Sequence, residues 1–121
     1  LSLSSALKNF DMMKIDGSKK HVLLGDMLEL GIHSKKLHKV ISQNINKTSI
    51  DTVNVIGKYM QDIYKNINNR KKGLILKKNS QIIDLIKNNI NNNDYLMIKG
   101  SNSTGLNKLT KNLKVGKINA L

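Results

Sequence analysis

The chain of 121 residues has no cysteine, no proline, few aromatic residues, few acids and no long apolar run. The absence of cysteine excludes disulfides and thiolate chemistry, which is typical of a cytoplasmic protein. No apolar stretch approaches the roughly 20 residues that a membrane-spanning helix needs, so we expect no membrane association. Leu1–Phe10 is amphipathic and lacks the apolar core of a signal peptide. We therefore expect a cytoplasmic globular domain and, because the chain begins with Leu, a piece of a longer polypeptide.

Acidic residues are scarce, because 8 Asp and Glu stand against 21 Lys and Arg and the net charge is +13. Such a charge is typical of proteins that bind nucleic acids. A coding sequence poor in G and C produces the same excess, since it enriches Lys, Asn and Ile throughout. The lysines are scattered, and the few aromatic residues supply no platform for base stacking. A nucleic-acid partner is therefore not favoured, and a stand-alone basic α/β module that binds RNA or another anionic partner is kept as the alternative hypothesis.

Apolar residues follow strand and helix periods in alternation along the chain. The predicted strands are His21–Leu24, Thr52–Ile56, Leu74–Leu76 and Tyr95–Ile98, and the tail Val115–Leu121 is a candidate for a short extra strand. The predicted helices carry apolar faces at Leu3, Leu7 and Phe10; at Leu37, Val40, Ile41 and Ile45; at Met60, Ile63, Tyr64 and Ile67; at Ile82, Ile83, Ile86 and Ile90; and at Leu106, Leu109 and Leu113. This alternation predicts an α/β fold, a three-layer Rossmann-like domain with a mostly parallel sheet and helices on both faces.

The first strand runs directly into a loop that contains two acids. Val22–Leu24 is a short continuous apolar run, typical of a strand that is covered on both faces. Gly25 permits a sharp turn, Asp26 stands where the strand stops, and Glu29 follows one turn later. Open α/β sheets bind ligands at the carboxyl ends of their strands, so these two acids are candidates to bind a cation or an amine. They could instead offset the positive charge of the chain and cap a turn, and the sequence leaves both interpretations open.

The loop Lys99–Gly105 lies between the last predicted strand and the last predicted helix. Free amides at the helix start, together with Lys99, Ser101 and Ser103, could hold a carboxylate or a phosphate. The same hydroxyls could merely cap the helix. Leu106 stands where a P-loop needs its Lys, so this chain alone is not expected to hydrolyse a nucleotide.

Other catalytic and metal-binding arrangements find little support. His33 and His38 are five residues apart, which does not place them on one face of a helix, and no metal site is predicted. A phospho-receiver domain needs an Asp at the end of a middle strand, and Val53–Gly57 has none. No nucleophilic triad can be read from the order of residues, so no catalytic residue is assigned.

Three segments together resemble a known family. His21–Gly31, continued to His38, resembles the first signature of the C-terminal domain of the Mur ligases. Lys99–Gly105 resembles the second signature of those members that add D-alanyl-D-alanine, and Leu1–Leu7 resembles the helix that follows the family's Asn-Pro element. The resemblance covers nearly the whole chain in order, and its first signature is the specific one.

The resemblance implies one domain of a three-domain enzyme. In the family, an N-terminal domain binds the UDP-sugar peptide, a central domain carries the ATP P-loop, and the C-terminal domain binds the incoming amino acid or dipeptide. The implied reaction is ATP-dependent amide formation, with ATP and Mg²⁺ in the full-length enzyme. UDP-N-acetylmuramoyl-tripeptide is activated as an acyl phosphate, and the amine of D-alanyl-D-alanine attacks it. Residues 1–121 are then the third domain without the other two and without its first strand, and we expect it to bind no cofactor and to be inactive alone.

The resemblance also assigns six substrate-binding residues: Asp26, Glu29, Lys99, Ser101, Asn102 and Ser103. The two acids face the cleft near the amine, and the remaining four hold the carboxylate of the dipeptide. This sequence departs from the family at Asn102, where Arg is usual, and at Thr104, where Met is usual. Losing the Arg removes a fixed cation, so Lys99 and the helix amides are expected to compensate.

Overall fold

A computed structural model of the chain describes residues 2–27, 35–100 and 118–120. These residues contain five strands in one sheet, and every neighbouring pair is parallel. In chain order the strands are β1 Lys20–Gly25, β2 Thr52–Ile56, β3 Lys72–Leu76, β4 Tyr95–Lys99 and β5 Ile118–Ala120. Their order across the sheet is β3-β2-β1-β4-β5, so β1 is central. The extra strand expected within the tail is confirmed as β5.

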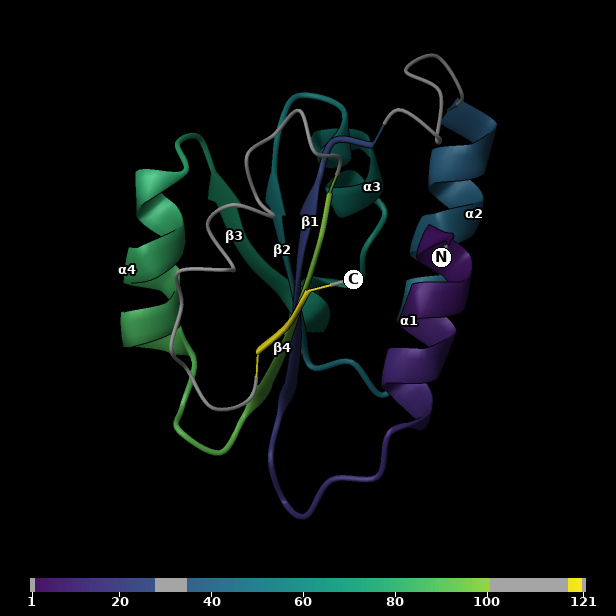
Figure 1. The fold of residues 1–121 in the computed structure, drawn as a ribbon. Coiled ribbons are helices and arrows are strands. Elements are labelled where there is room, and N and C mark those ends of the chain that lie inside the picture. Colours follow the sequence, from purple (N-terminus) through teal and green to yellow (C-terminus); the bar gives the residue numbers. More distant parts are fainter. Residues whose placement is uncertain (1, 28–34, 101–117, 121) are drawn as a thin grey trace.

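The described helices cover both faces of the sheet. They are α1 Leu3–Met12, α2 Lys35–Asn46, α3 Met60–Lys65 and α4 Ser80–Asn89, with a short 3₁₀ turn at Asn69–Lys71. Figure 1 shows α1, α2 and α3 on one side of the sheet and α4 on the other. The predicted three-layer Rossmann-like architecture is thereby confirmed. None of the described helices combines the length and the apolar character that a bilayer crossing requires.

Alternating side chains of the strands build a separate core on each face of the sheet. Val22, Leu24, Val53, Val55 and Met97 pack against α1, α2 and α3. Their neighbours of opposite parity pack against α4, and this second core contains Leu23, Ile56, Leu76, Leu96, Ile98, Ile82, Leu85 and Ile86. The strand sequences are apolar at successive positions because both faces are covered.

The buried stripe of α2 differs from the predicted one. Ile41 and Ile45 are buried as expected, but Leu37 and Val40 are exposed, and His38 and Ser42 take their places. The Ser42 hydroxyl makes this possible, since it lies 2.8 Å from the carbonyl oxygen of His38 and 2.8 Å from that of Ile63 in α3. A small side chain that satisfies its polar atom on the backbone lets two helices approach closely, and apolar periodicity does not reveal it.

The predicted stripe of α4 is also corrected at one position. Ile82 and Ile86 are buried, whereas Ile83 is 38% exposed and Leu85 is buried in its place. Ser2 caps α1 as expected, because its hydroxyl oxygen accepts a hydrogen bond from Ser5 N at 3.2 Å. The helix expected around Leu106–Leu113 lies outside the described residues.

Asn54 joins three strands from a buried position in β2. Its Nδ2 donates to the Val22 carbonyl of β1 at 3.1 Å, and its Oδ1 accepts from Leu74 N of β3 at 2.8 Å. The β2–β3 register shifts at this residue. A side chain on Gly73 would collide with the Asn54 amide, so glycine is required there. The amide thus replaces ladder hydrogen bonds where the register shifts.

A buried polar network fastens the amino ends of β1 and β4. His21 Nε2 lies 2.8 Å from Asp94 Oδ2, and His21 Nδ1 lies 2.6 Å from Thr52 Oγ1. Asp94 also accepts hydrogen bonds from Lys19 N and Asn91 N, each at 3.1 Å. Burial by itself raises the pKa of Asp94. The hydrogen bonds, above all that with His21, have the larger effect and hold the pKa below its ordinary value.

We expect Asp94→Asn to lower the free energy of unfolding by about 1–3 kcal/mol at neutral pH, because an amide cannot replace both acceptor oxygens. The lowered pKa means that the carboxylate stabilises the fold above its ordinary pKa of 3.8 and that this contribution is lost as the pH falls through the folded-state value. Urea denaturation between pH 7 and pH 3 measures both effects. Asp84→Asn, at an exposed position of α4, is the control and should change little. An equal loss in both variants would contradict the role of the network.

Candidate functional site

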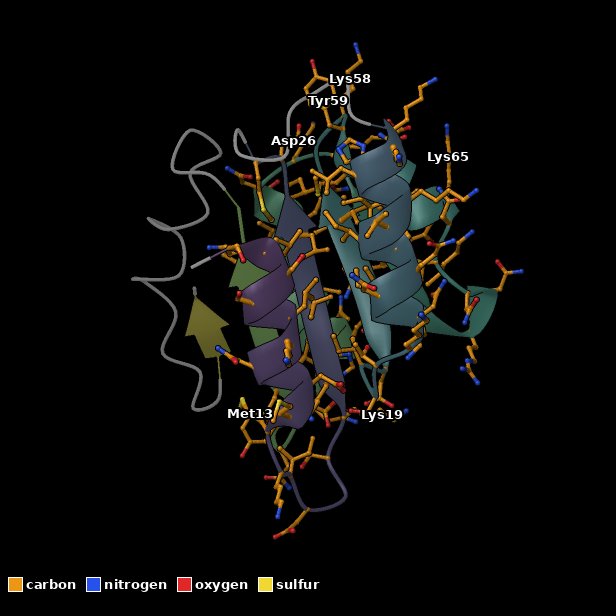
Figure 2. All side chains as sticks on the ribbon, turned by 90° about the vertical axis from the view of Figure 1, so that its right-hand side faces the viewer. Met13, Lys19, Asp26, Lys58, Tyr59 and Lys65 are labelled. Atoms are coloured by element: carbon orange, nitrogen blue, oxygen red, sulfur yellow. The ribbon has the colours of Figure 1, made fainter. Side chains whose placement is uncertain are left out.

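The carboxyl ends of β1, β2 and β4 meet at one edge of the sheet, here called the rim. The parallel register sets Leu24 opposite Lys99 and Gly25 opposite Ile56. Asp26 follows β1, Gly57, Lys58 and Tyr59 follow β2, and Lys99 ends β4. Figure 2 shows Asp26, Lys58 and Tyr59 together at this end of the molecule, with Met13 and Lys19 at the opposite end. The rim is the edge at which open α/β sheets bind ligands.

The side chain of Asp26 holds the start of α3. Its Oδ1 accepts hydrogen bonds from Tyr59 N at 3.0 Å and Met60 N at 3.1 Å. These amides belong to the first turn of the helix, where no helical carbonyl is available to them. Of the two interpretations left open by the sequence, capping is therefore observed for Asp26. The carboxylate is half-buried, and its position is fixed by the backbone of another segment.

Gly57 allows this carboxylate to approach the backbone. Its φ of +109° lies in a region that side chains rarely adopt, and a Cβ there would lie 2.6 Å from the carboxylate carbon of Asp26. Glycine is required on both grounds. The sequence shows this glycine at the end of a strand, but it does not show that its partner lies 31 residues earlier at Asp26.

Lys99 and Asp26 come from neighbouring strands and lie at the same rim. Lys99 is half-buried at the end of β4, and Gly100 continues the chain beyond it. Glu29, Ser101, Asn102 and Ser103, the other four predicted site residues, lie outside the described residues, as does His33. The structure thus brings two of the six predicted residues to one edge.

Sequence reasoning missed Lys58 as a residue of the rim. Its side chain is exposed and makes no hydrogen bond or ion pair with another described residue. A lysine directly after the glycine that ends a β-strand is the signal that could have identified it. The rim therefore carries cations on both sides of Asp26, a charge arrangement that attracts carboxylates and phosphates.

The rim differs from the hollows elsewhere on the described surface. One hollow of about 460 Å³ lies between the Lys14–Ser18 turn and the Asn91–Tyr95 segment, at the amino ends of the strands. It is lined by turn residues and lies at the wrong edge for a ligand of this architecture. Across the described residues, no three His, Cys, Asp or Glu side chains gather as metal ligands do.

Removing the Asp26 carboxylate should destabilise the protein through α3. We expect Asp26→Ala to lower the free energy of unfolding by about 0.5–2 kcal/mol. Asp26→Asn should lose less stability, because its amide oxygen can still accept the hydrogen bonds from α3. Thermal or urea denaturation measures both. The exposed Asp16 provides the control Asp16→Ala, which should be nearly neutral. If Asp26→Ala matched this control, the capping role would be wrong.

Comparisons with known proteins show which family the chain resembles. The family model described as "Mur ligase, glutamate ligase domain" matches residues 1–102. A UDP-N-acetylmuramoyl-tripeptide–D-alanyl-D-alanine ligase of Buchnera aphidicola subsp. Acyrthosiphon pisum (strain APS) is 33% identical over 115 residues, which cover 93% of this chain and 24% of the relative. A protein of the same name from Rickettsia prowazekii (strain Madrid E) is 28% identical over 108 residues, which cover 89% of this chain and 24% of the relative.

The chain spans about a quarter of the length of these curated relatives. The family match includes β1 to β4, Asp26 and Lys99, and it ends at Asn102. The resemblance inferred from the two signatures is thereby confirmed. The chain belongs to the Mur ligase family, a family of ATP-dependent amide ligases, and corresponds to its glutamate ligase domain.

Proposed function

We propose that this chain is the domain that binds D-alanyl-D-alanine in a longer cytoplasmic ligase of peptidoglycan synthesis. The enzyme would join this dipeptide to UDP-N-acetylmuramoyl-tripeptide at the expense of ATP. The observation that carries the proposal is the rim, where Asp26 follows β1 and Lys99 ends the neighbouring parallel strand β4. The shared name of both relatives supports the choice of the dipeptide.

In the proposed complex, different residues of the rim bind the carboxylate and the amine of the dipeptide. Lys99, with Ser101, Asn102 and Ser103, binds the carboxylate, since an ammonium and hydroxyl or amide donors suit an anionic group. Asp26 and Glu29 lie on the side of the amine. Asp26 acts first as a positioning residue, because its Oδ1 is held by two amides of α3.

ATP and Mg²⁺ would be bound outside this chain, whose sequence has no P-loop. ATP supplies the phosphoryl group that activates the tripeptide carboxylate. The chain's own contribution is to bind and orient the dipeptide and, on closing over the other domains, to exclude water from the activated carboxylate. We therefore propose that the domain works only as part of the longer protein.

The polypeptide that contains this domain together with the N-terminal and central domains should form amide product from UDP-N-acetylmuramoyl-tripeptide, D-alanyl-D-alanine and ATP. Lys99→Met should raise the KM for the dipeptide about tenfold or more, because a charge-assisted bond to its carboxylate is lost. Lys87→Met, on the exposed face of α4, is the matched control. Steady-state kinetics on folded variants measures both, and residues 1–121 alone should give no product. Turnover with single amino acids but not with the dipeptide would contradict the proposal.

A further inference from the structure

Three charged residues follow one another across the rim in the order of the strands. Lys99 ends β4, Asp26 follows the central β1, and Lys58 follows β2 on the far side. The proposed function uses Lys99 and Asp26 but leaves Lys58 without a role. Figure 2 shows the exposed Lys58 at the same end of the molecule as Asp26.

The backbone of Lys58 is held on both sides. Gly57 before it takes a left-handed conformation against the Asp26 carboxylate, and Tyr59 after it donates its N–H to Asp26 Oδ1 at 3.0 Å. Asp26 Oδ1 accepts hydrogen bonds from the backbone N–H groups of Tyr59 and Met60. Among the described residues, no ion pair joins Asp26 to Lys58. The backbone of Lys58 is therefore held at the rim, and its exposed ammonium can reach a ligand there.

The spacing of the row matches the reacting groups of the proposed reaction. Adjacent strands lie about 4.8 Å apart, so β4 and β2 are separated by about 10 Å. An extended dipeptide spans about 7 Å from carboxylate to amine. The carbon that the amine attacks lies about 3 Å further, and it carries the phosphate. With the carboxylate at Lys99, the amine lies near Asp26 and the phosphate near Lys58.

We propose that Lys58 binds the phosphate of the acyl phosphate that the dipeptide attacks. This inference rests on the proposed function. In the step concerned, the neutral amine forms the C–N bond, the C–O bond to phosphate breaks, and the electron pair leaves with the phosphate. The amine proton passes to the departing phosphate, which leaves as hydrogen phosphate. Lys58 stabilises the charge that accumulates on this leaving group.

Lys58 is better placed for this role than the other exposed lysines near the rim. Lys77 and Lys78 follow β3, which lies three strand spacings from β4, about 14 Å. That distance exceeds the span of the dipeptide and the attacked carbon together. Lys65 ends α3, and its Nζ lies 4.0 Å from Asp62 Oδ1. It provides a matched control, because it is another exposed lysine in the helix that follows Lys58.

The experiment compares Lys58→Met, Lys58→Arg and Lys65→Met in the full-length enzyme. We expect Lys58→Met to lower kcat about tenfold to a hundredfold, with the KM for D-alanyl-D-alanine within about twofold of wild type. Lys58→Arg should retain more activity because the charge remains. Product inhibition by inorganic phosphate should weaken about tenfold in Lys58→Met. Lys65→Met should match wild type in every measurement, and all variants should melt like wild type because both side chains are exposed.

Each outcome decides the inference. A higher KM for the dipeptide with unchanged kcat in Lys58→Met would mean that Lys58 binds the carboxylate, and the inference would be wrong. Identical behaviour of Lys58→Met and Lys65→Met would also overturn it. A wild-type enzyme that forms no product with D-alanyl-D-alanine would refute the proposed function itself, and this inference with it. A selective fall in kcat with weaker phosphate inhibition supports it.

Discussion

The parallel pairing of β1 on both of its edges is the constraint on which the rest of the structure depends. All six residues of β1 are buried, and it pairs with β2 on one side and β4 on the other. A slip by one residue would move Val22 and Leu24 out of one core and Leu23 out of the other, so both cores resist it. Because the three strands are parallel, the loops that follow them must leave at the same rim. The position of the site is a consequence of the packing of this strand.

Both ends of β1 are fixed by carboxylates that bind the backbone. At the amino end, Asp51 Oδ2 accepts from Lys20 N at 2.8 Å and Asp94 Oδ1 accepts from Lys19 N at 3.1 Å. At the carboxyl end, Asp26 binds the first amides of α3. The loop after β1 is therefore tied to the loop after β2 by hydrogen bonds and by the close approach at Gly57. Rigid support of this kind is what holds Lys58 and Asp26 in a defined relation.

Local patterns predicted the elements and the architecture because β1 to β4 and the described helices follow simple apolar periods. The same patterns gave the wrong buried stripe in α2, where Ser42 is buried, and they gave no role to the buried Asn54 in β2. The polar atoms of both side chains are hydrogen-bonded inside the core. A hydrophobicity pattern predicts that such polar residues are exposed. The partners of Asp26 and His21 lie 33 and 73 residues away, so their roles depend on tertiary structure.

For the site, the sequence predicted that Asp26 and Lys99 follow strands, and the structure brings both to one rim, while their roles in binding a substrate stay predictions. The residues alone left Asp26 open between binding and capping, and the capping hydrogen bonds are seen only when the backbone of α3 is placed. The resemblance to the Mur ligases supplied the family, which the charge and the periodicity did not. Lys58 escaped notice because no motif contains it. Its place follows from the strand order, since β2 and β4 are far apart in sequence and flank the same strand.

Many of the few acids in this strongly positive protein bind backbone amides. Four of the seven acids among the described residues accept hydrogen bonds from backbone amides: Asp11, Asp26, Asp51 and Asp94. A carboxylate used in this way stabilises a turn or a strand end and is less available to pair with a lysine. Buried cations are likewise satisfied by the backbone, as Lys71 Nζ is by the carbonyls of Thr48 and Ile50. At the rim, Asp26 accepts hydrogen bonds from the first amides of α3 and, within the described part of the chain, forms no ion pair with Lys58. At this edge, the proposed substrates would place the carboxylate of the dipeptide beside Lys99 and the phosphate of the acyl phosphate beside Lys58.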